Sequence, residues 1–285
     1  MTRYAKPTSL GEALAMLGKA PWRILAGGTD FYPALGNKPI SDDILDVNGL
    51  DELRGIEEAG DHWLIGARTT WTDIARHAFP PAFDALKQAA RELGSVQIQN
   101  VATVAGNLCN ASPAADGVPV LLALDAEVEL RSKAAVRHLP LARFILGNRR
   151  TAIGSGEMVT GIRIPRAGAE GRSAFVKLGA RRYLVISIAM AAARLMITDG
   201  RIERSAVAVG ACSAVASRLA GVEAALKGRP ADSSLAEAVL SAPMAELAPI
   251  DDVRGTAAYR LGAAREIVAR AVLAAIGSDR ERAAA

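Results

Sequence analysis

The amino-acid sequence predicts an α+β fold in two regions of about 165 and 115 residues. Signals for helices and signals for strands both recur along the 285 residues. A segment with charged residues and two glycines at 166–172 is the best boundary between the regions. Beyond it, Asp199-Gly200 lies between two apolar runs, which is a strong hairpin signal and predicts antiparallel strands.

The first region begins with a clear helix signal. Ser9-Leu10-Gly11-Glu12 matches a capping box, and Gly18 ends the helix that follows. Further along the chain, we expect strands at 22–26, 44–47 and 63–67, helices at 72–77 and 81–93, and strands at 126–130 and 158–164. Residues 100–115 are small and polar, so they are expected to supply little of the core.

The second region is predicted to combine an antiparallel sheet with helices. Its expected strands lie at 174–178, 184–197 and 201–211, and its expected helices at 215–227, 235–240 and 256–276. The run at 184–197 is rich in alanine and is compatible with a helix. We interpret it as a strand because the Asp199-Gly200 turn follows it.

Composition and charge argue against several classes of function. The formal net charge is +4 without a block of basic residues, and aromatic residues make up only 4% of the chain. A surface that stacks nucleic-acid bases on aromatic side chains is therefore not expected. The longest uncharged apolar stretch, 184–193, is about half as long as a membrane span requires. The N-terminus lacks the apolar core of a signal peptide, so we expect a cytoplasmic protein.

Cysteine and histidine usage limits the chemistry of the chain. Two cysteines, Cys109 and Cys212, exclude a disulfide framework and any four-thiolate iron–sulfur cluster within this chain. The three histidines lie far apart without the spacing of metal ligands, so no metal site is expected. No nucleophile with a partner base is evident, and we assign no catalytic residue.

Two segments offer backbone amides to a ligand. The first turn (26–30) ends a predicted strand with Gly27-Gly28-Thr29, whose N–H groups can hold a phosphate without obstruction from Cβ atoms. The alternative is an ordinary turn, since neither a P-loop nor a Rossmann fingerprint is present. The second segment (100–116) offers donors and, in Asp116, an acceptor for a sugar hydroxyl. Its alternative is an irregular surface loop.

Together these segments resemble a known family. Gly-Gly-Thr-Asp in the first turn and Thr-Val-Ala-Gly-Asn followed by Ser-Pro-Ala-Ala-Asp in the second segment are similar to the flavin subunit of the molybdenum hydroxylases. That family includes the medium chain of carbon monoxide dehydrogenase and the FAD domain of xanthine dehydrogenase. Residues 157–165 resemble the strand that closes the family's FAD domain, and 175–182 resemble the start of its C-terminal domain. The four segments occur in the family's order.

The resemblance implies a two-part FAD-binding domain of the PCMH type at 1–165 and a smaller α+β C-terminal domain at 173–285. It implies an FAD that is not covalently attached, because the first turn contains no His or Cys. The first turn would hold the pyrophosphate, the second segment the diphosphate and ribityl side, and Asp116 a sugar hydroxyl. Carried over to this chain, the cofactor-binding residues would be Leu25, Ala26, Gly27, Gly28, Thr29, Asp30, Thr103, Gly106, Asn107, Asp116, Val159 and Lys177.

The chain departs from the family pattern at two positions. Ala105 stands where the family usually has a second glycine, and an alanine there requires a negative φ or strain. Gln99 replaces a more usual basic residue, which alters a contact with a phosphate or a partner. The other donors of the second segment remain.

The resemblance also implies partners. In this family a large subunit holds the molybdenum cofactor, and a small subunit carries [2Fe-2S] clusters that pass electrons to FAD. This chain would be the FAD subunit of such a complex, with an (αβγ)2 assembly and an acceptor such as NAD or a quinone. Two alternatives stay open: a stand-alone flavin reductase or oxidase with the same FAD-domain architecture, and a flavin-free assembly module.

Overall fold

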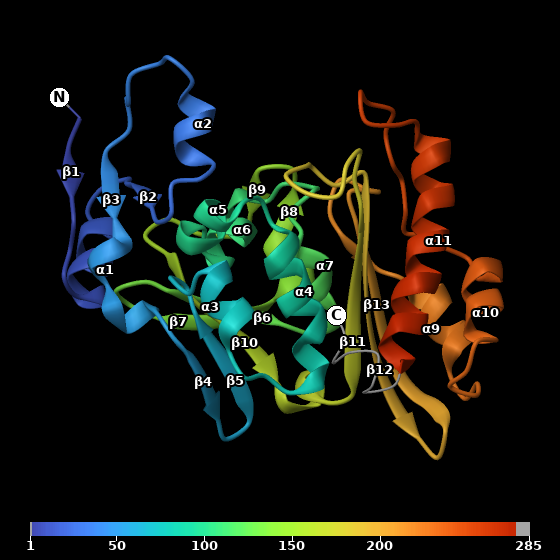
Figure 1. Ribbon diagram of the computed structural model, residues 1–285. Coiled ribbons are helices and arrows are strands. Elements are labelled where there is room, and N and C mark those ends of the chain that lie inside the picture. Colours follow the sequence, from blue (N-terminus) through green and yellow to red (C-terminus); the bar gives the residue numbers. More distant parts are fainter. Residues whose placement is uncertain (1, 278–285) are drawn as a thin grey trace.

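The computed structural model describes residues 2–277, which form three units in a row (Figure 1). The N-terminal lobe (residues 2–53) is a three-stranded parallel sheet in the order β1-β3-β2 with two helices. Its elements are β1 (Tyr4–Ala5), α1 (Leu10–Leu17), β2 (Arg23–Leu25), α2 (Phe31–Leu35) and β3 (Ile44–Asp46). Ser9 caps α1, since its Oγ accepts a hydrogen bond from the backbone N–H of Glu12.

The central unit is a five-stranded antiparallel sheet in the order β4-β5-β10-β6-β7. Its strands are β4 (Ile56–Ala59), β5 (His62–Gly66), β6 (Glu127–Arg131), β7 (Val136–Pro140) and β10 (Met158–Pro165). The other elements of this unit are α3 (Trp71–Arg76), α4 (Asp84–Glu92), α5 (Val96–Val101), α6 (Val104–Asn110), α7 (Gly117–Ala123), α8 (Leu141–Phe144), β8 (Ile145–Gly147) and β9 (Arg150–Thr151). The last strand, β10, lies in the middle of the sheet, so it closes the unit.

The C-terminal unit is a four-stranded antiparallel sheet in the order β11-β12-β13-β14. Its elements are β11 (Arg172–Leu178), β12 (Ala189–Thr198), β13 (Arg201–Gly210), β14 (Ser217–Arg218), α9 (Ala220–Leu226), α10 (Leu235–Ser241) and α11 (Ala257–Ile276). Asp199 and Gly200 both have positive φ, as a tight turn between antiparallel strands requires.

Both faces of this C-terminal sheet are covered. Side chains alternate along a strand, so Met190 and Ala192 of β12 pack into the core of the central unit. Ala191 and Ala193 pack instead against the C-terminal helices, which lie on the opposite face. The sheet is therefore shared between two hydrophobic cores.

The predicted α+β class, the first helix and the Asp199-Gly200 hairpin are confirmed. Four predictions are wrong in detail. Residues 100–115 are largely helical and contribute Val104 and Leu108 to the core. The strand expected at 184–197 begins only at Ala189, and the helix expected at 215–227 begins at Ala220 because β14 precedes it. The capping box is present only in part, since the Glu12 carboxylate accepts a hydrogen bond from Thr8 and not from Ser9.

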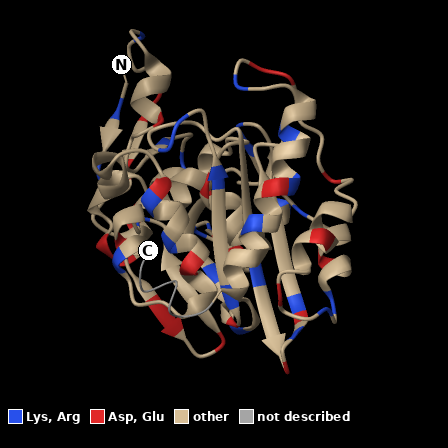
Figure 2. Cartoon of the chain, turned by 45° about the vertical axis from the view of Figure 1, so that its right-hand side comes forward, with Lys and Arg blue, Asp and Glu red and all other residues tan. Residues whose placement is uncertain are grey.

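Charges of both signs are interspersed on the elements of the protein (Figure 2). This mixture is in keeping with the modest net charge. Within residues 2–277, no helix is both long and apolar enough to cross a membrane.

Candidate functional site

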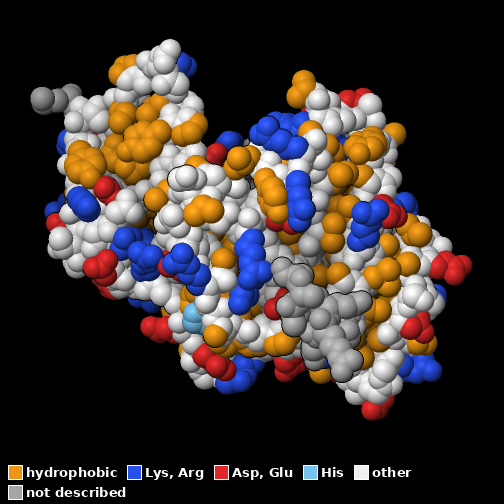
Figure 3. Space-filling model, in the orientation of Figure 1, with side chains coloured by type: hydrophobic (Ala, Val, Ile, Leu, Met, Phe, Trp, Pro, Cys, Tyr) orange, Lys and Arg blue, Asp and Glu red, His pale blue; other side chains and the backbone are white. Residues whose placement is uncertain are grey.

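The first turn joins β2 to α2 and meets the second segment backbone to backbone. A Cβ atom added to Gly27 would lie 2.0 Å from the backbone oxygen of Val101, far inside van der Waals contact. Gly28 has φ +70, a conformation that favours glycine. Gly27 lets the N-terminal lobe approach the central unit, whereas Gly28 leaves room for Tyr32 within the lobe. Figure 3 shows the surface hollowed between the lobe that carries α2 and the rest of the protein.

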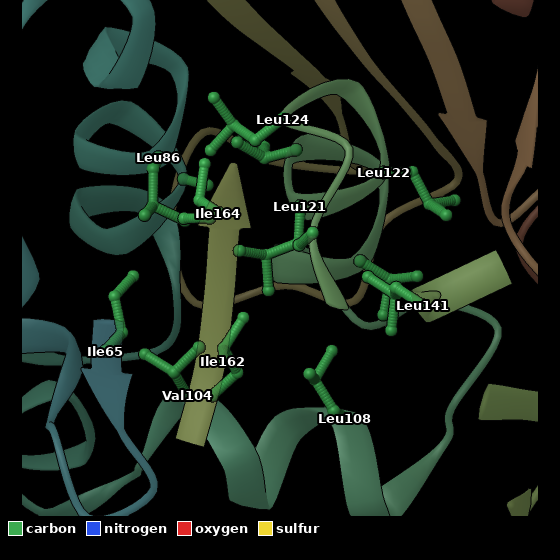
Figure 4. Close-up of a cluster of buried hydrophobic side chains, with 14 of the residues drawn as sticks. Ile65, Leu86, Val104, Leu108, Leu121, Leu122, Leu124, Leu141, Ile162 and Ile164 are labelled. Atoms are coloured by element: carbon green, nitrogen blue, oxygen red, sulfur yellow. The ribbon is translucent and has the colours of Figure 1, made fainter. Parts of the chain in front are cut away.

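The second segment places α6 against the first turn. Thr103 caps this helix, and its Oγ1 accepts a hydrogen bond from the Gly106 N–H at 3.0 Å. Val104 and Leu108 anchor the helix on the core beside Ile162 (Figure 4). Ala105 is buried inside α6 with an ordinary helical backbone, so its departure from the family's glycine causes no strain.

Asn107 carries a buried amide oxygen that has no hydrogen-bond partner among the described residues. The oxygen faces the start of α7, where a Cβ atom added to Gly117 would lie 3.0 Å from it. A buried acceptor without a donor costs free energy. A hydrogen-bond donor at this position would remove that cost.

Asp116, Lys177 and Ser187 form a buried polar cluster between the central and C-terminal units. Lys177 Nζ lies 2.7 Å from Asp116 Oδ2, and the Ser187 hydroxyl donates to Asp116 Oδ1 at 2.6 Å. The two charged side chains are only 5% and 8% exposed. Burial raises the pKa of Asp116, and the Lys177 ammonium and the Ser187 hydroxyl oppose that rise.

The cluster lies beside Asn107, because Asp116 directly precedes the glycine that packs against the Asn107 oxygen. A carboxylate has about four lone-pair sites, so Asp116 retains capacity for a sugar hydroxyl after these two contacts. Glu92, at the end of α4, also interacts with the cluster. Its burial raises its pKa, while Lys177 and Arg182 act in the opposite direction.

The other predicted residues are distributed around this site. Leu25 is buried at the end of β2, and the Ala26 carbonyl accepts a hydrogen bond from Asn48. Thr29 is half-buried, and Asp30 lies 4.0 Å from the guanidinium of Arg149. Val159 is packed in the core of the central unit, together with Ala105 and Leu108. The structure thus joins the first turn to the second segment and Asp116 to Lys177, while it places Val159 within the core.

Beside the Gly27 contact lies a groove of about 270 Å³ that the sequence did not indicate. Arg54 and Arg68 line it, each paired with a carboxylate (Asp73 and Asp51), and the Arg68 Nε is buried without a partner among the described residues. The groove is lined by Ala26, Gly27, Asn48, Arg54, Arg68, Thr70, Asn100, Val101 and Thr103. Isolated arginines and asparagines give no pattern in a sequence. For Ser187, in the polar cluster described above, the sequence offers one signal, which is a polar residue within an apolar run.

A larger cavity of about 370 Å³ lies elsewhere, between β12, β13 and α9. Four of its charged groups pair with one another, since Asp125 pairs with both Arg194 and Arg218, and Arg218 pairs with Glu223. Among residues 2–277 no group of three His, Cys, Asp or Glu side chains could hold a metal ion. The glycine contacts, the orphan oxygen and the buried cluster therefore mark the better candidate site.

Comparison with known proteins gives the family of the chain. The family described as "FAD binding domain in molybdopterin dehydrogenase" matches residues 1–167, and "CO dehydrogenase flavoprotein C-terminal domain" matches residues 174–275. The chain is 35% identical to the nicotinate dehydrogenase FAD-subunit of Eubacterium barkeri over 73% of each chain. It is 31% identical to the glyceraldehyde dehydrogenase medium chain of Sulfolobus acidocaldarius over 93% of each chain.

A solved structure extends the similarity to three dimensions. A chain of the reconstituted CO dehydrogenase from Oligotropha carboxidovorans matches with a TM-score of 0.88 and 27% identity, covering 97% of this chain and 98% of that one. The two matched families, the curated relatives and this structure agree on one kind of protein. This chain belongs to the FAD-binding medium subunits of the molybdenum hydroxylase family, which are oxidoreductase subunits.

Proposed function

We propose that this chain holds one FAD, without a covalent bond, and passes electrons from the [2Fe-2S] clusters of a partner subunit to a final acceptor such as NAD or a quinone. The observation that carries the proposal is the backbone contact at Gly27, which brings the first turn against the second segment. A bound flavin can accept electrons one at a time from one-electron carriers and release them as a pair, which suits it to a transfer from iron–sulfur clusters to NAD or a quinone.

The chain's own residues bind and orient the cofactor in this proposal. Backbone N–H groups of the first turn and the Thr103-capped end of α6 would hold the pyrophosphate, because glycines leave them accessible. The Asn107 oxygen would accept a hydrogen bond from the cofactor, and Asp116 would accept one from a sugar hydroxyl. Lys177 would place a positive charge nearby. Val159 would contribute apolar contact from β10.

The proposed complex contains a molybdenum-cofactor large subunit and a [2Fe-2S] small subunit in an (αβγ)2 assembly in the cytoplasm. This chain does not supply an iron–sulfur cluster itself, because it has only two cysteines. Both are free thiols rather than a disulfide, in keeping with a reducing compartment. The medium-chain and FAD-subunit names of its relatives support the division of labour among subunits.

The first experiment is the visible absorption spectrum of the freshly purified chain, with mass analysis of any cofactor released on denaturation. Flavin bands and about one FAD per chain, either as purified or after addition of FAD, are expected. A colourless protein that also fails to take up added FAD would contradict the proposal and favour a flavin-free assembly module.

Substitutions then locate the cofactor. Gly27→Ala would press a methyl group onto the Val101 carbonyl, so we expect FAD affinity to fall at least about tenfold. Gly11→Ala is the matched control, because a Cβ atom at Gly11 meets nothing within 4 Å. Equal FAD affinity in the two variants would place the cofactor away from the first turn.

A further inference from the structure

Ser187 is a buried polar residue in an otherwise apolar run. It is the one polar side chain between Leu184 and Ala193, and it is only 2% exposed. Its hydroxyl donates to Asp116 Oδ1 at 2.6 Å, across the junction between the C-terminal and central units. A buried hydroxyl costs free energy unless it is hydrogen-bonded, so this contact accounts for a serine at the position.

The carboxylate that Ser187 contacts depends on residues from the C-terminal unit. Asp116 begins α7 of the central unit, whereas Lys177 lies on β11 and Ser187 just before β12. The two carboxylate oxygens have different partners: Lys177 donates to Oδ2 and Ser187 donates to Oδ1. The two contacts together fix the direction of the carboxylate, because rotation of the Asp116 side chain would break both.

We propose that Ser187 is a positioning residue of the cofactor site, whose hydroxyl bonds the Asp116 carboxylate and keeps it turned toward Lys177. The ammonium of Lys177 is thereby held in one place beside the site assigned to FAD. This inference rests on the proposed function, because it deepens the account of that same site. It assigns to the C-terminal unit a direct part in shaping the cofactor site.

The charged surroundings of the cluster are limited to a few groups. Lys177 acts on Asp116 directly, and burial opposes ionisation of the carboxyl. Glu92, from α4, interacts with both Lys177 and Asp116, and Arg182, from the β11–β12 connection, acts on Glu92. Glu92 is the other carboxyl whose titration would affect the site, so the test must separate its contribution from that of Asp116.

The test measures FAD affinity of the full-length chain by flavin fluorescence from about pH 4 to about pH 8. Protonation of Asp116 removes an anionic acceptor and releases Lys177, so the dissociation constant for FAD changes as Asp116 titrates. A hydrogen bond to the charged form favours that form. Ser187→Ala should therefore move this inflection upward by about one pH unit, which is a tenfold change in the proton affinity of Asp116.

Three variants make the result specific. Ser187→Thr keeps a hydroxyl and should keep the wild-type inflection. Ser173→Ala removes an equally buried hydroxyl, 2% exposed, that bridges the same two units through Ala82 and Ala85, and it should leave the inflection in place. Glu92→Gln identifies any inflection that belongs to Glu92. Circular dichroism verifies that each variant is folded.

The outcomes separate the two proposals. An unmoved inflection in a folded Ser187→Ala chain that binds FAD would overturn the role of Ser187 and leave the proposed function intact. The same shift in Ser173→Ala would also overturn it, because the shift would then reflect loosening between the units. A wild-type chain that takes up no FAD would instead overturn the proposed function.

Discussion

At the scale of single residues, the ion pair between Lys177 and Asp116 holds two charges away from water. Each charge offsets the desolvation cost of the other, and either charge alone would be buried without an opposite charge nearby. Burial of either charge therefore requires the other one, and the ion pair as a whole adds little to the net stability of the fold.

Removing one partner should accordingly cost more than removing both. Lys177→Met leaves a buried carboxylate uncompensated, and we expect the free energy of unfolding to fall by about 3–5 kcal/mol at neutral pH. In the double variant Lys177→Met with Asp116→Leu, most of this loss should be recovered. Urea denaturation of the wild type, both single variants and the double variant measures the difference. Additive losses would show that the two side chains act independently.

Several features of the site could be predicted from single residues, and others could not. Gly27 was predictable because a close approach demands a residue without Cβ, and Thr103 because its hydroxyl fits a helix cap. Ser187 and Arg68 were not, because their importance comes from partners far away in the sequence. The strain considered for Ala105 does not arise, because the residue lies in a helix that the sequence did not predict.

At the scale of elements, a charge pair that depends on pH links β7 to the start of β10, across the strand β6 that lies between them. Arg137 on β7 donates two hydrogen bonds to Glu157, which directly precedes β10. The hydrogen bond from Arg137 is the main cause that holds the pKa of Glu157 below its ordinary value. A lowered folded-state pKa stabilises the protein above the unfolded-state pKa, and this stabilisation is lost as pH falls through the folded-state pKa.

Glu157→Gln should therefore be less stable than the wild type at neutral pH by at most about 1 kcal/mol. The difference should disappear as pH falls from about 4.3, the usual unfolded-state pKa of Glu, through the lower folded-state pKa. Chemical denaturation at a series of pH values measures it. A difference that is constant with pH would indicate lost packing rather than lost charge.

Two helical glycines should respond in opposite directions to the same substitution. Gly262 lies in α11, and a Cβ atom there meets nothing within 4 Å, so Gly262→Ala should raise stability by about 0.5–1 kcal/mol. Gly221 lies in α9, where the added atom would be 2.5 Å from the Pro243 carbonyl oxygen, so Gly221→Ala should lower stability. Thermal unfolding of both variants compares them directly. Equal shifts would mean that helix propensity outweighs the contact.

The strand β12 and the helix α9 both begin later in the chain than the sequence pattern predicts. Residues 184–188 are apolar enough to continue β12, but Leu184 has φ +53 and Arg181 bonds its carbonyl, so this stretch forms a loop. Val215 and Ser217 fit a helical pattern, yet the chain pairs Ser217 with Val209 and starts α9 later. A local turn in the first case and a strand pairing in the second override the sequence pattern, and neither can be read from periodicity alone.

At the scale of the whole molecule, Arg194 of β12 fastens the C-terminal unit to the central one. Its buried guanidinium donates to the Ala123 carbonyl at 2.7 Å, to the Ala167 carbonyl at 2.8 Å and to the Asp125 carboxylate. Because one planar group serves all three acceptors, no smaller cation can replace it.

Arg194→Met should lower the free energy of unfolding by about 3–5 kcal/mol, since it leaves the Ala123 carbonyl without its donor and Asp125 without one of its two cationic partners. Arg204→Met is the matched control, because Arg204 on the next strand makes an exposed pair with Glu170 and should cost at most about 1 kcal/mol. Calorimetry measures both variants. Similar losses would show that Arg194 does not join the units.

The alanines on the two faces of β12 have a consequence for how such chains diversify. Met190 and Ala192 fit one core and Ala191 and Ala193 the other, so each face has been matched to a different neighbour. A recombination event at 166–172 would bring in a foreign sheet face against helices that never packed on it, and close packing tolerates such mismatches poorly. We therefore expect the central unit and the β12 face that carries Met190 and Ala192 to be inherited together.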